Sequence, residues 1–115
     1  MKAIIYHNPR CSKSRQTLAL LEEKDLDLEI IEYLKAPLDE KTLKDVLSKL
    51  DMNPMELMRK GESVFKELNL ADKADDTQAL VNAMVENPIL IERPIVLAND
   101  KASIGRPPES VLEIL

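Results

Sequence analysis

The stretch "KAIIYHNPRCSKSRQTLALLEEKDLDLEIIEYL", residues 2–34, contains the pattern that decides the fold. Residues 2–7 are a short apolar run that ends at an Asn-Pro pair, which indicates a buried strand. Residues 12–24 are good helix formers, and residues 26–34 alternate apolar side chains as a second strand does. A strand, a helix and a strand in succession form a βαβ unit, in which the two strands run parallel.

Beyond this unit the pattern becomes helical. Residues 38–87 have helical periodicity, and helix starts are predicted at the capping residues Asp39, Asn53 and Asp75 or Asp76. The helix that follows Asn53 and Pro54 is expected to end at Gly61. These residues therefore predict an all-helical segment between two α/β segments.

The last part of the chain returns to strands. "PIVLANDKASIG" has two short apolar runs around Asn99-Asp100, which predicts a hairpin. A final helix is expected from Pro107, with its inward residues at Val111, Leu112 and Leu115.

The complete order is β-α-β, helices, β-β-α, which is the element order of thioredoxin with a helical insert. We therefore expect one α/β domain over residues 1–115, with a mixed four-stranded sheet. Residues 1–37 and 88–115 form its thioredoxin-like core, and residues 38–87 form an inserted helical subdomain.

The composition limits the functions that this chain can have. It has 115 residues, a net charge of −5 and one cysteine, which excludes an internal disulfide and a cysteine-based metal cluster within one chain. No apolar run approaches the ~20 residues of a membrane span, and the N-terminus does not resemble a signal peptide, so we expect a cytoplasmic protein without a membrane partner. Residues 1–21 have a charge of +4 and the rest have −9, which favours a small anion over nucleic acid.

The single cysteine, Cys11, is expected to be a reactive thiol. It lies between the first strand and the first helix, where free N–H groups and the helix dipole stabilise a thiolate or bind an oxyanion. Basic neighbours add positive potential, with His7 as a further candidate: Arg10, Lys13 and Arg15. The simpler alternatives are a small buried cysteine and a histidine that only makes a hydrogen bond.

Three further arginines are candidate anion ligands because a guanidinium binds an oxyanion with two parallel hydrogen bonds. Arg59 lies at a helix end, Arg93 directly before a strand, and Arg106 between a strand and a helix. Each of them alone fits an ordinary surface charge. Pro94 is a candidate cis proline, or simply a proline at the start of a strand.

The sequence resembles the glutaredoxin-coupled arsenate reductase family, which has a thioredoxin fold with a helical insert. The matching segments occur in order along nearly the whole chain: "HNPRCSKSR", "LMRKGE", "FKELNL", "NPILIERPIV" and "IGRPPE". The resemblance implies that Cys11 is the nucleophile and that His7 helps to tune it. It also implies the remaining site residues: Arg59, Arg93 and Arg106 for the oxyanion, Pro94 as the cis proline, and Ser12, Ser14 and Arg15 in support.

The implied activity is the reduction of arsenate to arsenite, and thus arsenic detoxification. Because the chain has no second cysteine, the reaction needs glutathione as co-substrate and a glutaredoxin to accept the mixed disulfide, with no bound cofactor or metal.

Of three other functions, the sequence sets one aside and leaves two as alternatives. A phosphatase-like enzyme needs Cys-x5-Arg, but here the arginine is Arg15 and position 17 is a threonine. A regulator that binds RNA polymerase would use a Cys-x-x-Cys switch, which is missing from "CSKS". A glutathione-dependent thiol oxidoreductase that acts on another substrate has the same sequence signature as the reductase.

Overall fold

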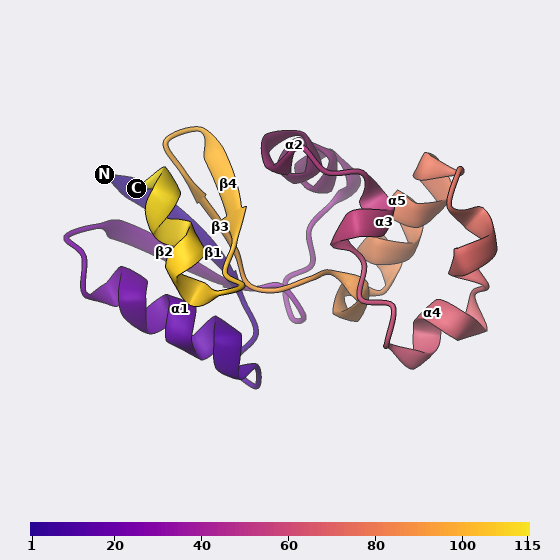
Figure 1. The fold of residues 1–115 in the computed structure, drawn as a ribbon, viewed down its shortest axis with the longest axis horizontal. Coiled ribbons are helices and arrows are strands. Elements are labelled where there is room, and N and C mark those ends of the chain that lie inside the picture. Colours follow the sequence, from indigo (N-terminus) through magenta and orange to yellow (C-terminus); the bar gives the residue numbers. More distant parts are fainter. The chain divides into compact units, whose positions relative to one another are not determined.

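The computed structural model describes residues 1–115, which divide into two compact units (Figure 1). The first unit consists of Met1–Ala36 and Arg93–Leu115, and the second consists of Pro37–Glu92. The longest helices have 11 residues, and no helix has both the length and the apolar character to cross a membrane.

The first unit is built on a four-stranded sheet. Its strands are β1 (Lys2–His7), β2 (Asp27–Glu32), β3 (Ile95–Ala98) and β4 (Lys101–Ile104), and their order is β2-β1-β3-β4. β1 pairs with β2 in parallel, whereas β1 with β3 and β3 with β4 pair antiparallel. The predicted parallel pair and the mixed sheet are therefore confirmed. Helix α1 (Ser12–Glu22) connects the parallel pair.

One face of this sheet is covered by α1 and by the C-terminal helix η3 (Pro108–Ile114), which pack on each other. Alternate residues of β1 and β3 meet on that face, as the register Ala3↔Ala98 and Ile5↔Val96 shows. They form the core together with residues of both helices: Leu21, Val111 and Ile114.

In the last segment of the chain, the structure confirms the predicted hairpin but contradicts part of the predicted inward face of the final helix. The hairpin at Asn99-Asp100 is confirmed, and both residues have positive φ (54° and 62°), as a tight two-residue hairpin turn requires. The prediction that Leu112 lies on the inward face of the final helix is wrong. Its side chain is 37% exposed, and Ile114 is buried in its place. The helix is a 3₁₀ helix with three residues per turn, so Val111 and Ile114 share one face.

The second unit is helical, and its elements are α2 (Glu40–Leu50), α3 (Pro54–Leu57), α4 (Ser63–Glu67), η1 (Leu70–Lys73), α5 (Thr77–Glu86) and η2 (Pro88–Leu90). The predicted caps are confirmed, since Asp39, Asn53 and Asp76 each accept a hydrogen bond from the backbone N–H three residues later.

The end of α3 and the end of the helical unit differ from the sequence prediction. α3 ends at Leu57 rather than at Gly61, because Met58 is extended and forms a β-bridge with Ile91. The N–H of Arg59 donates to Leu90 O at 2.7 Å, and the N–H of Glu92 donates to Leu57 O at 2.8 Å. These bonds tie residues 88–92 to the helical unit, although the sequence pattern assigns them to the core.

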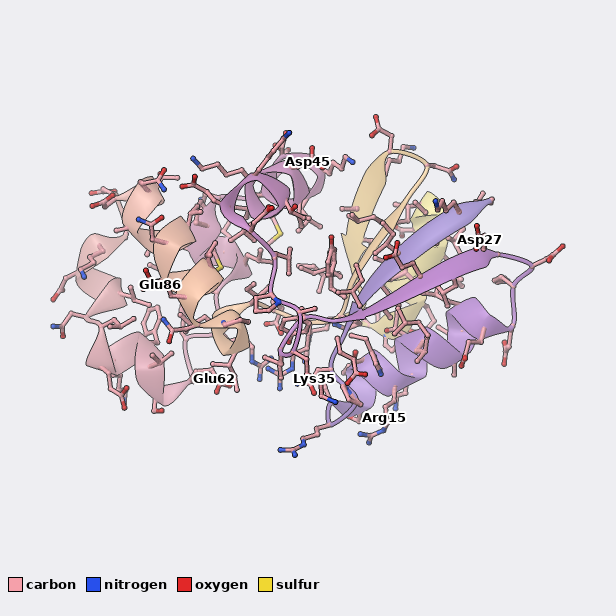
Figure 2. The ribbon with its side chains drawn as sticks, turned by 180° about the vertical axis from the view of Figure 1, so that it is seen from behind. Arg15, Asp27, Lys35, Asp45, Glu62 and Glu86 are labelled. Atoms are coloured by element: carbon pink, nitrogen blue, oxygen red, sulfur yellow. The ribbon has the colours of Figure 1, made fainter.

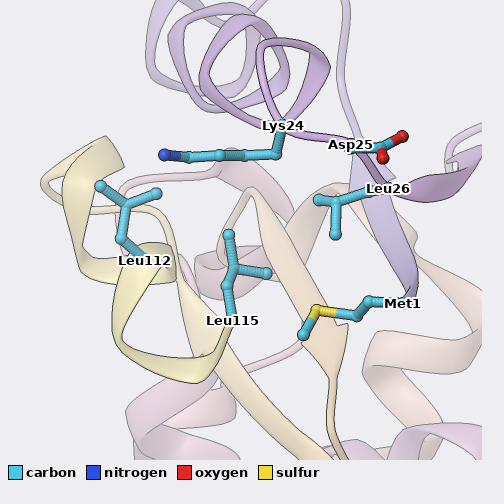
Figure 3. A pocket seen from close by; sticks show the side chains of 6 residues that line it. All are labelled: Met1, Lys24, Asp25, Leu26, Leu112 and Leu115. Carbon is cyan, nitrogen blue, oxygen red and sulfur yellow. The ribbon is translucent and has the colours of Figure 1, made fainter.

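Near the chain termini the first unit has an open pocket of about 370 Å³ (Figure 3). Met1, Leu26, Leu112 and Leu115 surround it, and the chain of Lys24 lies along its rim. Because β1 and α1 run in opposite directions, this pocket lies at the end of the unit opposite to Cys11.

Candidate active site

Cys11 occupies the N-cap position of α1, directly after the loop that follows β1. Its backbone is extended (φ −96°, ψ 124°), and its carbonyl accepts the first helical hydrogen bond from the N–H of Arg15 at 3.0 Å. Its own N–H donates to Asn8 O at 3.0 Å. The sequence prediction that Cys11 begins the first helix is therefore confirmed.

The surroundings of the Cys11 sulfur favour the thiolate. Burial alone would raise the pKa of Cys11, but the N–H groups of Ser14 and Lys13 and the guanidinium of Arg93 outweigh it, so the pKa is lowered. The sulfur accepts no capping hydrogen bond from the backbone. The N–H groups of Ser14 and Lys13 nevertheless lie close enough to the sulfur to stabilise its negative charge. The thiol is thus both buried and activated, as a nucleophilic cysteine needs to be.

Two of the three predicted arginines lie at this sulfur. A terminal nitrogen (Nη2) of Arg106 is 3.6 Å from Cys11 Sγ, and the Nε of Arg106 donates to Arg93 O at 2.8 Å. The Arg93–Pro94 peptide is cis, as the family resemblance implied for Pro94, and the Arg106–Pro107 peptide is also cis. The segments before β3 and after β4 therefore bring two guanidinium groups to the start of α1.

Arg59 belongs to the helical unit, where two carboxylates hold it. Its Nη1 is 2.7 Å from Glu92 Oε1, and its Nε is 3.3 Å from Glu62 Oε2. Burial alone would lower the pKa of Arg59, but Glu92 and Glu62 raise it, so this side chain is a permanent cation. Its predicted role in anion binding stays a prediction.

His7 contacts Ser14 and is uncharged, so it adds no positive potential at the Cys11 thiol. It is 6% exposed, and its Nδ1 lies 2.7 Å from Ser14 Oγ, which also accepts the N–H of Asn8 at 3.0 Å. Burial lowers the pKa of His7 below its usual value, only partly opposed by Glu32, so the imidazole is neutral at pH 7. The expectation that His7 adds positive potential is therefore wrong. His7 instead holds Ser14, whose N–H faces the sulfur.

The other basic residues of the motif lie around the loop. Figure 2 shows Arg15 on the first turn of α1, and its Nη1 donates to Pro9 O at 3.0 Å. Arg10, Ser12 and Lys13 are exposed. Of the predicted supporting residues, Ser14 is fully buried and Ser12 is exposed. Arg15 stabilises the loop before α1 through its hydrogen bond to Pro9 O.

Sequence reasoning missed three residues that shape this site. Asn8 is buried and orders the loop, since its Oδ1 accepts the N–H of Arg10 at 3.0 Å. Thr17 is fully buried and donates to Lys13 O at 2.8 Å. Gly105 packs against Thr17 and Pro94. Two features of the sequence could have indicated these residues: the Asn-Pro pair that follows the first strand, and the glycine that precedes Arg106-Pro107.

The lowered pKa of Cys11 predicts fast alkylation at neutral pH. The midpoint of the iodoacetamide reaction should lie below the ~8.5 of an ordinary cysteine, because the thiolate is the species that reacts. The rate is measured as a function of pH by mass spectrometry. Free glutathione in the same buffers is the control, and a Cys11 midpoint at or above that of an ordinary thiol would contradict the assignment.

The fold and the site together define a class of protein: a thioredoxin-like domain with one activated thiol at the N-cap of its first helix and two arginines beside it. The chain belongs to the ArsC family, whose model matches residues 6–114.

Relatives of known sequence and structure agree with this assignment. The chain is 60% identical to the "Uncharacterized protein YfgD" of Escherichia coli (strain K12), over 96% of this chain and 94% of that protein. It is 50% identical to a Haemophilus influenzae protein called "Arsenate reductase", over the full length of both. The solved structure "Arsenate reductase from Vibrio cholerae" is 51% identical and superposes with a TM-score of 0.93, over 100% of this chain and 98% of that one.

Proposed function

We propose that this protein is an arsenate reductase that uses glutathione and a glutaredoxin as its reductants. The observation that carries the proposal is the contact between a guanidinium nitrogen of Arg106 and the Cys11 sulfur, at the N-terminus of α1. This contact supports a nucleophile and an oxyanion ligand at the same place. The names of the relatives from Haemophilus influenzae and Vibrio cholerae favour arsenate as that oxyanion.

In the first step the Cys11 thiolate attacks the arsenic of arsenate. A sulfur–arsenic bond forms, and one arsenate oxygen takes up protons and leaves as water. The guanidinium groups of Arg93 and Arg106 lie near the Cys11 sulfur, which supports a role in neutralising the negative charge of the oxygens in the transition state. Arg59 is proposed as a third anion ligand on the strength of the family resemblance.

The second step removes the arsenic and needs an external thiol, because Cys11 is the only cysteine. A glutathione thiolate attacks the Cys11 sulfur, a sulfur–sulfur bond forms, and the electron pair of the sulfur–arsenic bond stays on arsenic. Arsenic(V) thereby becomes arsenic(III), while two thiols are oxidised to one mixed disulfide. A glutaredoxin thiolate then takes the glutathionyl sulfur and releases the Cys11 thiolate, whose lowered pKa makes it a good leaving group.

The proposal predicts arsenite formation by the purified protein when arsenate, glutathione and glutaredoxin are all present. Arsenite is quantified by chromatography coupled to arsenic detection. Thioredoxin should replace glutaredoxin poorly, because a protein with one cysteine forms no internal disulfide for it to reduce. Absence of arsenite, together with deglutathionylation of a test mixed disulfide, would replace the reductase with a thiol oxidoreductase that acts on another substrate.

A further inference from the structure

A second cavity in the first unit lies next to the cysteine loop. Its volume is about 210 Å³, and it is lined by His7, Asn8, Pro9, Arg10, Glu32, Leu34 and Lys35. The parallel pairing of β1 with β2 places His7 opposite Glu32, so the cavity lies where both strands end. We propose that this cavity binds one end of glutathione, a refinement that rests on the proposed reductase function.

The position of the cavity relative to Cys11 fits the geometry of the second step. β1 lies between β2 and β3 in the sheet. Arg93 precedes β3 and Arg106 follows β4, so the oxyanion ligands reach the sulfur from the β3 side. The cavity lies on the β2 side of the same loop. A thiolate that displaces arsenic from sulfur must approach opposite to the sulfur–arsenic bond. An arsenic held by the arginines on the β3 side therefore leaves the β2 side of the loop for the incoming thiolate.

The size of the cavity suits part of a tripeptide. Small-molecule pockets usually have about 300–1,000 Å³, so this cavity encloses one end of glutathione and leaves its cysteinyl sulfur outside. An extended tripeptide spans roughly 10 Å, and consecutive Cα atoms are about 3.8 Å apart. Cys11 directly follows the lining residue Arg10, so the cavity borders the loop that carries the nucleophile.

The charges of the cavity complement those of glutathione. Glutathione carries two carboxylates and one ammonium group, and the lining offers two cations, Arg10 and Lys35, with one carboxylate, Glu32. Lys35 extends from the turn after β2, where Figure 2 shows it, and its contact with Glu32 is a loose, exposed 3.6 Å ion pair that a ligand can exchange. Leu34 is 40% exposed and supplies an apolar wall.

The experiment is an NMR titration of the whole protein with S-methylglutathione, which keeps every charge of glutathione but cannot react. We expect the backbone amide signals of residues 7–10 and 32–35 to shift. The double variant Arg10→Ala/Lys35→Ala should bind about fivefold more weakly, the effect of losing two exposed charge pairs. Lys24→Ala is the matched control, because it removes an exposed lysine from the pocket at the other end of the same unit.

Enzyme kinetics provide an independent measurement. The double variant should raise the KM for glutathione, and Lys35→Ala alone should raise it less while leaving the KM for arsenate within twofold of wild type. Circular dichroism of each variant verifies the fold.

The outcomes separate the two proposals. If S-methylglutathione shifts the cavity amides but arsenate is not reduced, the reductase function fails and the glutathione site stands. If arsenate is reduced but the shifts lie elsewhere, or the double variant binds like wild type, the site is overturned.

Discussion

Replacing Cys11 with serine is expected to abolish arsenate reduction while the protein stays folded. A serine hydroxyl is not ionised at neutral pH and forms no disulfide, so both steps at the Cys11 sulfur are lost. The rate of arsenite formation should fall by roughly 10⁴-fold or more, as removal of a catalytic nucleophile does elsewhere. The measurement is arsenite formation with glutathione and glutaredoxin in excess.

The stability of the same variant tests the position of Cys11 in α1. Serine is a preferred N-cap residue, because its oxygen accepts the free N–H groups of the first turn, so at a pH below the pKa of Cys11 the melting temperature of Cys11→Ser should equal or exceed that of wild type. Above that pKa wild type gains the stability of its thiolate, which the serine variant lacks. Cys11→Ala is the matched control and should melt lower than Cys11→Ser, with the same loss of activity. Turnover by Cys11→Ser would show that the nucleophile lies elsewhere in the chain.

Replacing Gly105 with alanine is expected to reduce both stability and activity. A Cβ at this position would collide with Thr17 Oγ1 and would lie 2.8 Å from Pro94 Cγ. Thr17 is fully buried, and the carbonyl of Pro94 accepts a hydrogen bond from the N–H of Gly105 at 2.9 Å. Moving either residue away from the new Cβ would therefore cost stability. Overpacking of this kind costs about 1–3 kcal/mol. The melting temperature should fall by roughly 4–8 °C for each kcal/mol lost.

The loss of activity follows from the chain position of Gly105. A shift there moves Arg106 away from Arg93 O and from the Cys11 sulfur, so the KM for arsenate should rise beyond the effect of stability. Gly61→Ala is the control, since a Cβ at Gly61 has open space around it. Equal melting temperatures for the two variants would contradict the packing of Gly105.

The sequence by itself determined the features that depend on local chemistry. The strand, the Asn-Pro turn and the helix around Cys11 follow from the short-range pattern of residues 2–22, and the capping side chains of the helical unit act within one turn. The same holds for the hairpin at Asn99-Asp100, because few residue pairs accept positive φ at both positions. These features need no knowledge of the rest of the chain.

Only the tertiary structure decided which distant residues meet at Cys11. Sheet pairing brings Arg93 and Arg106 to a sulfur more than eighty positions earlier in the chain. Burial lowers the pKa of His7, so this residue, which is hydrogen-bonded to Ser14, is a neutral support rather than a cation. The β-bridge between Met58 and Ile91 ends α3 early, against the local pattern. Burial and long-range hydrogen bonding set these outcomes, and neither is encoded in the spacing of neighbouring residues.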